Sequence, residues 1–465
     1  MIALAWRLLR AGGVARAVLV ACCTALVTTL LLLVVDDALL PTTATEWLMT
    51  ILADPSERLG TAVGTTLLAL PPLLLLYQSV HFGTTARERR LAALRLAGAT
   101  PAQVRLVGAV EVGIPSSGGA VAGLLLFWLL RSVAGGTPMP SMAGRSSWIV
   151  PRTAMHPHLV PTEVAPPWWG YLAVVAGTAM LGVAVGLLAT RGVVATPLGV
   201  VRRVRRSRPT PWPLLLIALG GVLAVVLAAH ENDAGYDTVQ SDGDLILVVA
   251  ALLVVVGLTA SSPWIAWTAG HLASRRVRSA PALLGARRLA EDPRPAGRAG
   301  AAIGAIGSVC GGVVATYLDF RSLSRGGPYG DVRAYAIGPL ELICLAVLAA
   351  LVVVVGSLAV HSVEELLERR RSVAALVALG IPEDVVSRSQ RWELALVALP
   401  AAVVGALLGA GGMLLLAEGE AAMVPALVIV PVLAALLVLL AVWAAVALVR
   451  PMARRVARPD HLRVE

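Results

Sequence analysis

Long apolar runs alternate with short polar segments along this chain. Ten of the runs hold the roughly 20 mostly apolar residues that a helix needs to cross a bilayer. A membrane-spanning helix satisfies its own backbone hydrogen bonds, and the alternation typical of barrel strands is not seen. The pattern therefore predicts an all-α polytopic membrane protein with ten transmembrane helices. The expected spans are 17–35, 60–82, 106–130, 168–190, 212–229, 245–269, 299–318, 335–360, 394–417 and 424–449.

The segments between these runs alternate strictly in charge. One set comprises the N-terminus, 84–105, 191–211, 271–298, 361–391 and the C-terminal tail, and it holds 31 of the 38 basic residues. The other set is rich in Asp and Glu. The positive-inside bias then predicts a multi-pass protein of the cell membrane with both termini in the cytoplasm. We expect Trp168, Trp169 and Trp212, at span ends, to act as interface anchors.

Composition supports the membrane prediction and limits the chemistry. Hydrophobic residues make up 58% of the chain and charged residues 14%, whereas soluble domains are closer to half and a quarter. Every basic residue is Arg, so a P-loop, which needs its Lys to reach nucleotide phosphates, is excluded. We therefore expect no enzyme activity and no cofactor in this chain. The Arg side chains are expected to face anionic lipid at the inner surface and not nucleic acid.

Part of the sequence occurs twice, with a constant spacing of 282 positions. The first copy contains Arg87, Arg89, Ala92, Ala93, Leu94, Gly98, Val104, Glu111, Gly123 and Leu125. The second contains Arg369, Arg371, Ala374, Ala375, Leu376, Gly380, Val386, Glu393, Gly405 and Leu407. Each copy is a basic segment that ends at a glycine between two apolar runs. The duplication predicts two parallel four-helix repeats.

The repeat and the charge pattern together predict the domain organisation. We expect an amphipathic segment at 1–14, a four-span unit at 15–191, basic loops with a two-span bridge at 192–277, a second amphipathic segment at 278–297, a second four-span unit at 298–450 and a basic tail at 451–465. None of the outer connections is long enough for a large extracellular domain. The apolar run after Arg16 is expected to be a retained span, since no small-residue cleavage pattern follows it.

The repeated basic segment has the pattern of a short helix along the inner membrane surface. In the first copy, Leu91, Leu94 and Ala97 or Gly98 fall on one helical face, and the Arg residues lie away from it. Gly98 is expected to cap this helix, and Pro101 to open the next one. The segment could be a docking element for another protein or an electrostatic anchor to anionic lipid. The shared glycine and apolar residues favour docking.

At this point the chain resembles a known family. Basic residues, a small apolar run, Leu and then Gly98-Ala99-Thr100-Pro101 are similar to the signature of FtsX-like permeases of the MacB and BceB type. The resemblance implies the membrane part of an ATP-binding-cassette system, whose segments 87–98 and 369–380 contact a separate ATPase. The implied coupling residues are Arg87, Arg89, Arg90, Leu91, Leu94, Gly98, Arg369, Arg371, Val373, Leu376 and Gly380. The short gap at 319–334 departs from the BceB branch, which carries a large extracellular domain there.

Two further positions bear on the mechanism. Glu111 and Glu393 lie at the same place in the two copies, just inside predicted spans, where a carboxylate is costly. They could form a gate or an ion pair with the Arg residues of the repeated basic segment, or they could reach the interface as snorkelling side chains. His156 and His158 do not complete a metal site. The four Cys residues are expected to be reduced core residues.

The expected function is that of a permease subunit moved by a cytoplasmic ABC ATPase, two copies of which would dock on one chain and bind the ATP and Mg²⁺. Short outer loops favour an amphipathic or lipophilic substrate such as an antibiotic, a hydrophobic peptide or a lipid. An alternative is mechanotransmission to an outer enzyme or a sensor kinase, without transport. An ion-driven carrier is disfavoured by the scarcity of charge in mid-membrane.

Overall fold

The computed structural model of the protein describes most of the apolar segments and several of their connections. The described residues are 14–39, 65–66, 68–77, 91, 93–134, 166–195, 208–234, 240–326, 344–345, 347–349, 351–356, 358–359, 362, 382–416 and 424–456. The regular elements among them are α-helices, as the hydrophobic pattern predicted. The long helices are α2 (Val14–Ala38), α6 (Pro101–Ala134), α7 (Trp168–Ala195), α8 (Leu214–Ala234), α9 (Gln240–Arg276), α10 (Ala280–Glu291), α11 (Pro293–Gly326), α14 (Glu383–Leu416) and α15 (Ala426–Val456).

Seven helices in the described part of the chain are long and apolar enough to cross a membrane. They coincide with the first, third, fourth, sixth, seventh, ninth and tenth predicted spans. Three shorter apolar helices, Leu68–Tyr77, Leu214–Leu227 and Val347–Gly356, lie at the remaining predicted spans. The protein is therefore an all-α polytopic membrane protein, while a count of ten spans stays a prediction.

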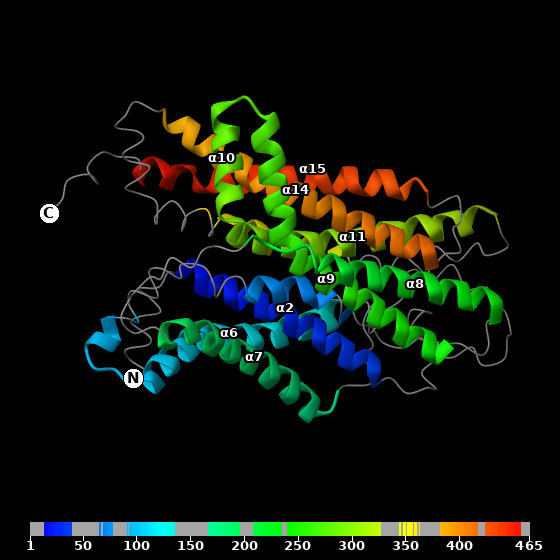
Figure 1. Cartoon of the computed structure of the whole chain (residues 1–465). Helices are drawn as coiled ribbons and strands as arrows, with labels where there is room; N and C mark the ends of the chain where they lie inside the picture. The colour runs from blue at the N-terminus through cyan, green and yellow to red at the C-terminus, as the bar shows by residue number, and fades with distance from the viewer. Residues whose placement is uncertain are drawn as a thin grey trace.

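The helices form two groups that pack side by side (Figure 1). In the first group α2 packs against α6 and α6 against α7; in the second, α11 packs against α14 and α14 against α15. The helices α6 and α14 each have 34 residues, and both their ends are 282 positions apart, which is the spacing of the sequence repeat. The first residues of α2, α6 and α14 and the last residues of α15 lie at the same end of the bundle.

The bridge between the groups contains a long helix, α9, and is followed by the short helix α10, which packs back onto it. The helix α9 has 37 residues with Pro263 inside it, and α10 packs against both α9 and α14. The expected amphipathic segment is thus a helix whose buried face consists of Ala282, Gly285, Ala286 and Leu289. These residues are mostly small, so α10 can approach its neighbours closely. Its Arg287 stays exposed.

The core is continuous between the two groups. One cluster joins Leu19, Leu75 and Val112 of the first half to residues of α11, α14 and α15. A second cluster packs Leu68 and Ala69 of the short second helix with Val309 and Val347 of the other half. The second and eighth predicted spans therefore lie where the two halves meet.

Candidate functional site

The helix of the first repeated segment ends in a C-cap at Gly98. Gly98 has φ +93°, a left-handed conformation that glycine adopts without steric cost. The Gly98 N–H donates to the Arg95 carbonyl at 3.0 Å, and the Ala99 N–H donates to the Leu94 carbonyl at 3.0 Å. These two bonds define a Schellman motif. The prediction that Gly98 caps this helix is confirmed.

The next helix begins directly after this cap. The Thr100 N–H donates to Gln103 Oε1 at 2.9 Å, and the Gln103 N–H donates to Thr100 Oγ1 at 3.3 Å. This reciprocal capping box, followed by Pro101 in the first helical position, starts α6 as predicted. The segment and the long helix α6 are therefore joined by one stiff corner with no flexible linker.

The apolar face of the segment turns inward. Leu91 is buried together with Val104 and Val107 of α6, and Leu94 packs against them. The expectation that Leu91 and Leu94 belong to a docking surface is therefore not supported by their placement. Leucines at this spacing cover the first turns of α6, because burying them against the chain itself removes apolar area from water.

Leu96 is the apolar residue that the segment presents outward. Its side chain is 81% exposed, and it lies beside the exposed Ala93 and Ala97. Leu96 was not among the residues predicted from the sequence. Its position off the helical face of Leu91 and Leu94 could have indicated its exposure. An exposed leucine at the tip of a rigid corner is a candidate contact for a partner protein.

Several predicted coupling residues lie outside the described residues. In the first copy these are Arg87, Arg89 and Arg90. In the second copy they are Arg369, Arg371, Val373, Leu376 and Gly380. Their part in coupling stays a prediction.

An ion pair joins α6 to the first helix, about three turns beyond the corner. Arg16 Nη1 of α2 lies 3.6 Å from Glu111 Oε1 of α6, and the two side chains are 8% and 11% exposed. Glu111 thus forms an ion pair, but its partner belongs to the first spanning helix and not, as had been expected, to the repeated basic segment.

Glu393 occupies the corresponding place in the second half and is 9% exposed. The residue 282 positions after Arg16 is Arg298 of α11, whose side chain lies outside the described ones. The helix α10 covers this part of α14: a Cβ added at Gly285 would lie 3.0 Å from the Glu393 nitrogen. Glu393 is therefore an internal residue of a helix-packing interface.

A second ion pair joins the opposite ends of the same two helices. It was not predicted from the sequence. Arg131 Nη1 donates to Asp36 Oδ1 at 2.9 Å, and the two side chains are 6% and 1% exposed. The Arg131 guanidinium also lies over the Trp128 ring at 5.9 Å, and Trp128 stacks on Tyr171 of α7. Opposite charges at the ends of the first and third spans were the signal available in the sequence.

Repeated glycines allow close packing between the two ion pairs. A Cβ added at Gly123 of α6 would lie 2.5 Å from the Ala25 carbonyl of α2. The corresponding Gly405 of α14 lies directly against the backbone of Gly304 in α11. The same glycine thus brings the first and third helices together in each half. With ion pairs at both ends, α2 and α6 form a rigid unit.

The remaining candidate chemistry is sparse. Cys22, Cys23, Cys310 and Cys344 are free thiols. Only Cys23 is buried, while Cys22 and Cys344 are exposed on helix surfaces, so the expectation that all four are core residues is wrong. No group of three or more metal-ligating side chains occurs among the described residues. His156 and His158 lie outside that part of the chain.

Comparison with known families agrees with the architecture of the first half. Residues 62–198 match the family of FtsX-like permease C-terminal domains, a range that includes the first repeated basic segment, α6 and α7. Residues 62–198 are thus similar to the FtsX-like permeases, the family that the sequence resemblance predicted. No significant match to a curated protein was found.

Proposed function

We propose that this protein is the permease subunit of an ABC transporter, driven by a separate cytoplasmic ATPase. The family match supports a permease-type membrane subunit. The absence of Lys from the sequence requires a partner to hold the nucleotide phosphates. The two repeated segments offer docking places for two ATPase copies, which would bind the ATP and Mg²⁺, with the repeated Arg residues near anionic lipid.

The stiff corner at Gly98 is the observation that carries this proposal. A force applied at Leu96 reaches α6 without passing through a flexible linker, because the Schellman motif and the capping box join the two helices. The helix α6 then moves together with α2, since ion pairs and close glycine contacts join them. Docking at one end of the bundle would thus move α2 and α6 together as one unit within the membrane.

The substrate class follows from where such a movement acts. The moving helices lie among other apolar spans, so an amphipathic or lipophilic molecule is the substrate that we expect, exported or extracted from the membrane. Mechanotransmission to an outer enzyme or a sensor kinase uses the same movement without cargo. Substrate-stimulated ATPase activity in liposomes supports transport, whereas a stable complex with a kinase or hydrolase and no cargo stimulation supports signalling.

The docking test compares two exposed leucines. Leu96→Asp should reduce the ATPase that copurifies with one chain from two copies to one and lower the stimulation of ATP hydrolysis, because it places a charge in one of the two proposed contacts. Leu272→Asp is the matched control, since Leu272 is also exposed, at 53%, but lies on α9 away from the segment. Unchanged ATPase stoichiometry and unchanged stimulation in Leu96→Asp would show that the ATPase docks elsewhere.

A further inference from the structure

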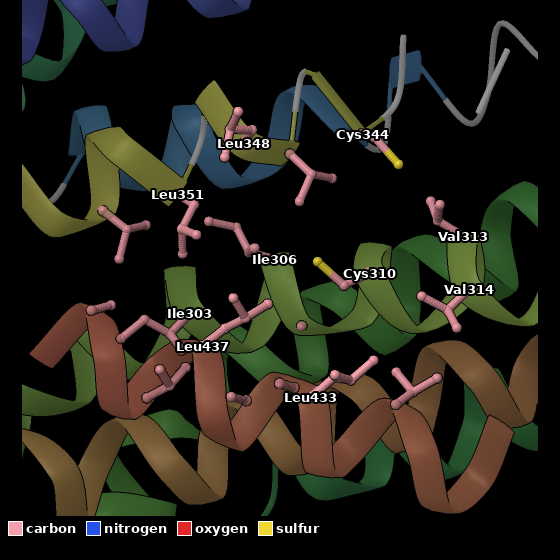
Figure 2. Close-up of a pocket in the computed structure, with 18 of the residues that line it drawn as sticks. Ile303, Ile306, Cys310, Val313, Val314, Cys344, Leu348, Leu351, Leu433 and Leu437 are labelled. Atoms are coloured by element: carbon pink, nitrogen blue, oxygen red, sulfur yellow. The ribbon is translucent and has the colours of Figure 1, made fainter. Parts of the chain in front are cut away.

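A cavity opens on the side of the second half, between α11, α15 and the short helix Val347–Gly356. Its volume is about 260 Å³, and Figure 2 shows side chains of all three elements converging on it. The lining consists of aliphatic residues and glycine, together with the thiols of Cys310 and Cys344. Among the described residues, the lining therefore offers no polar group that could hold a charged or strongly polar molecule.

The cavity has a closed floor and an open rim. The floor is formed by Ile303 and Leu358, which are 5% and 3% exposed. The rim is formed by Leu348, Leu433 and Leu437, which are 58%, 45% and 45% exposed. Because α11 and α15 are long and apolar enough to cross the membrane, the rim on α15 faces the hydrocarbon of the bilayer and not water. A molecule can enter sideways from the lipid phase.

The shape of the cavity fits a chain better than a compact molecule. On α11 its lining extends from Ile303 to Val314, which at about 1.5 Å per residue corresponds to about 16 Å along the helix. That is close to half of the roughly 30 Å thickness of the hydrocarbon core. The lining lies in the middle of the span Ala299–Leu318, at the depth where the ends of acyl chains meet. Apolar cavities of about 150 Å³ stay dry and take up small hydrocarbons. The larger cavity here is suited to one extended alkyl chain.

The geometry points to a binding site for the hydrocarbon chain of a membrane phospholipid. The end of the chain lies along α11 between α15 and the short helix Val347–Gly356, and the headgroup stays at the bilayer surface. Burial of each methylene against the apolar lining, in place of disordered neighbouring chains, adds dispersion contacts. This site goes beyond the proposed coupling to an ATPase, because lipid binding requires no motor.

The first half has a corresponding cavity with different chemistry. It lies between α2, the helix Leu68–Tyr77 and α7, the counterparts of the elements above. The corresponding lining pairs are Thr24 and Ile306, Leu31 and Val313, and Leu76 and Leu358, each 282 positions apart, and Ala173 and Leu433, Val174 and Ala434, Gly177 and Leu437, Thr178 and Val438, and Leu181 and Ala441, each 260 apart.

Two of these pairs exchange a hydroxyl for an aliphatic side chain. In the first half, the Thr28 hydroxyl donates to Thr178 Oγ1 at 2.9 Å, so this cavity is bordered by a helix-to-helix hydrogen bond. In the second half Ile306 and Val438 replace Thr24 and Thr178, and the lining is apolar throughout. The repeats have thus diverged at equivalent places, and the second one is specialised for hydrocarbon.

Retained lipid on the isolated chain tests the site. The full-length chain is reconstituted in vesicles of phosphatidylglycerol and phosphatidylethanolamine, extracted in detergent and measured by native mass spectrometry without any ATPase. We expect one phospholipid per chain to remain after the loosely bound lipids are removed. Leu437→Trp fills the cavity and should lower this occupancy about tenfold, since the chain and the indole cannot share the space.

The matched control is Leu440→Trp, one turn away on the same helix. Leu440 is 67% exposed and does not line the cavity, so its replacement should leave the retained lipid unchanged. If Leu437→Trp does not give a monodisperse protein, Leu348→Trp at the exposed rim carries the same test. Unchanged occupancy in the cavity-filled variant, or a retained mass that is not a phospholipid, overturns the assignment. A failure of Leu96→Asp to disrupt ATPase docking leaves this result unaffected.

Discussion

The Arg16–Glu111 ion pair offers the sharpest test of how the first half is held together. At 3.6 Å and an effective dielectric constant of about 20, the attraction between the two charges is on the order of 5 kcal/mol. The net value is smaller, because both charges lost hydration on burial. Removal of one partner leaves the other charge buried and typically costs about 3–5 kcal/mol. The slight exposure of both side chains places the expected loss near the lower end.

We therefore expect Glu111→Leu to lower the free energy of unfolding by about 3 kcal/mol. The double variant Arg16→Met/Glu111→Leu should recover to within about 1 kcal/mol of the native protein, because an apolar pair of similar volume carries no unpaired charge. Reversible unfolding in mixed detergent micelles measures both values. The variant Glu111→Leu should also bind the ATPase normally but stimulate it less, since α6 is no longer tied to α2. A loss below about 1 kcal/mol in the single variant, or a double variant no more stable than the single one, would refute the reasoning.

Three further predictions concern the same helix pairs. Gly405→Ala should destabilise the protein by about 1–3 kcal/mol in the same micelle assay, because the added methyl meets the α11 backbone, whereas Gly118→Ala, with open space around it, should be neutral. Gly98→Ala should cost about 1 kcal/mol and weaken ATPase binding in a pull-down titration; an unchanged affinity would separate the corner from docking. Asp36→Asn should destabilise through the uncompensated guanidinium of Arg131, and a thermal shift equal to that of a surface substitution would contradict this.

Local signals in the sequence were sufficient for the helices and for the corner. Apolar runs of spanning length predicted the helical class, because a chain in lipid must satisfy its own backbone groups. The Gly98 cap and the start of α6 at Pro101 were predicted as well. Both depend on hydrogen bonds between neighbours in sequence, and only glycine enters the left-handed region at no cost. The constant spacing of 282 positions likewise anticipated the equal lengths of α6 and α14.

The inward or outward direction of each face depended on tertiary structure. Leu91 and Leu94 were expected to dock a partner but pack on α6, because apolar periodicity identifies a buried face without naming what buries it. The Asp36–Arg131 pair joins residues 95 positions apart, and such a contact arises only when α2 and α6 lie together. The packing of α10 on α14 has the same origin.

The sequence by itself thus determined the membrane class, the repeat and the local caps, all of which depend on composition or on residues a few positions apart. The tertiary structure alone decided which charged side chains form ion pairs and that Leu96 is the exposed leucine of the first repeated segment. It also decided that the two repeats enclose equivalent cavities of different polarity. These features depend on helix packing, in which the distance between side chains is set by the shapes of helices far apart in sequence and not by their order along the chain.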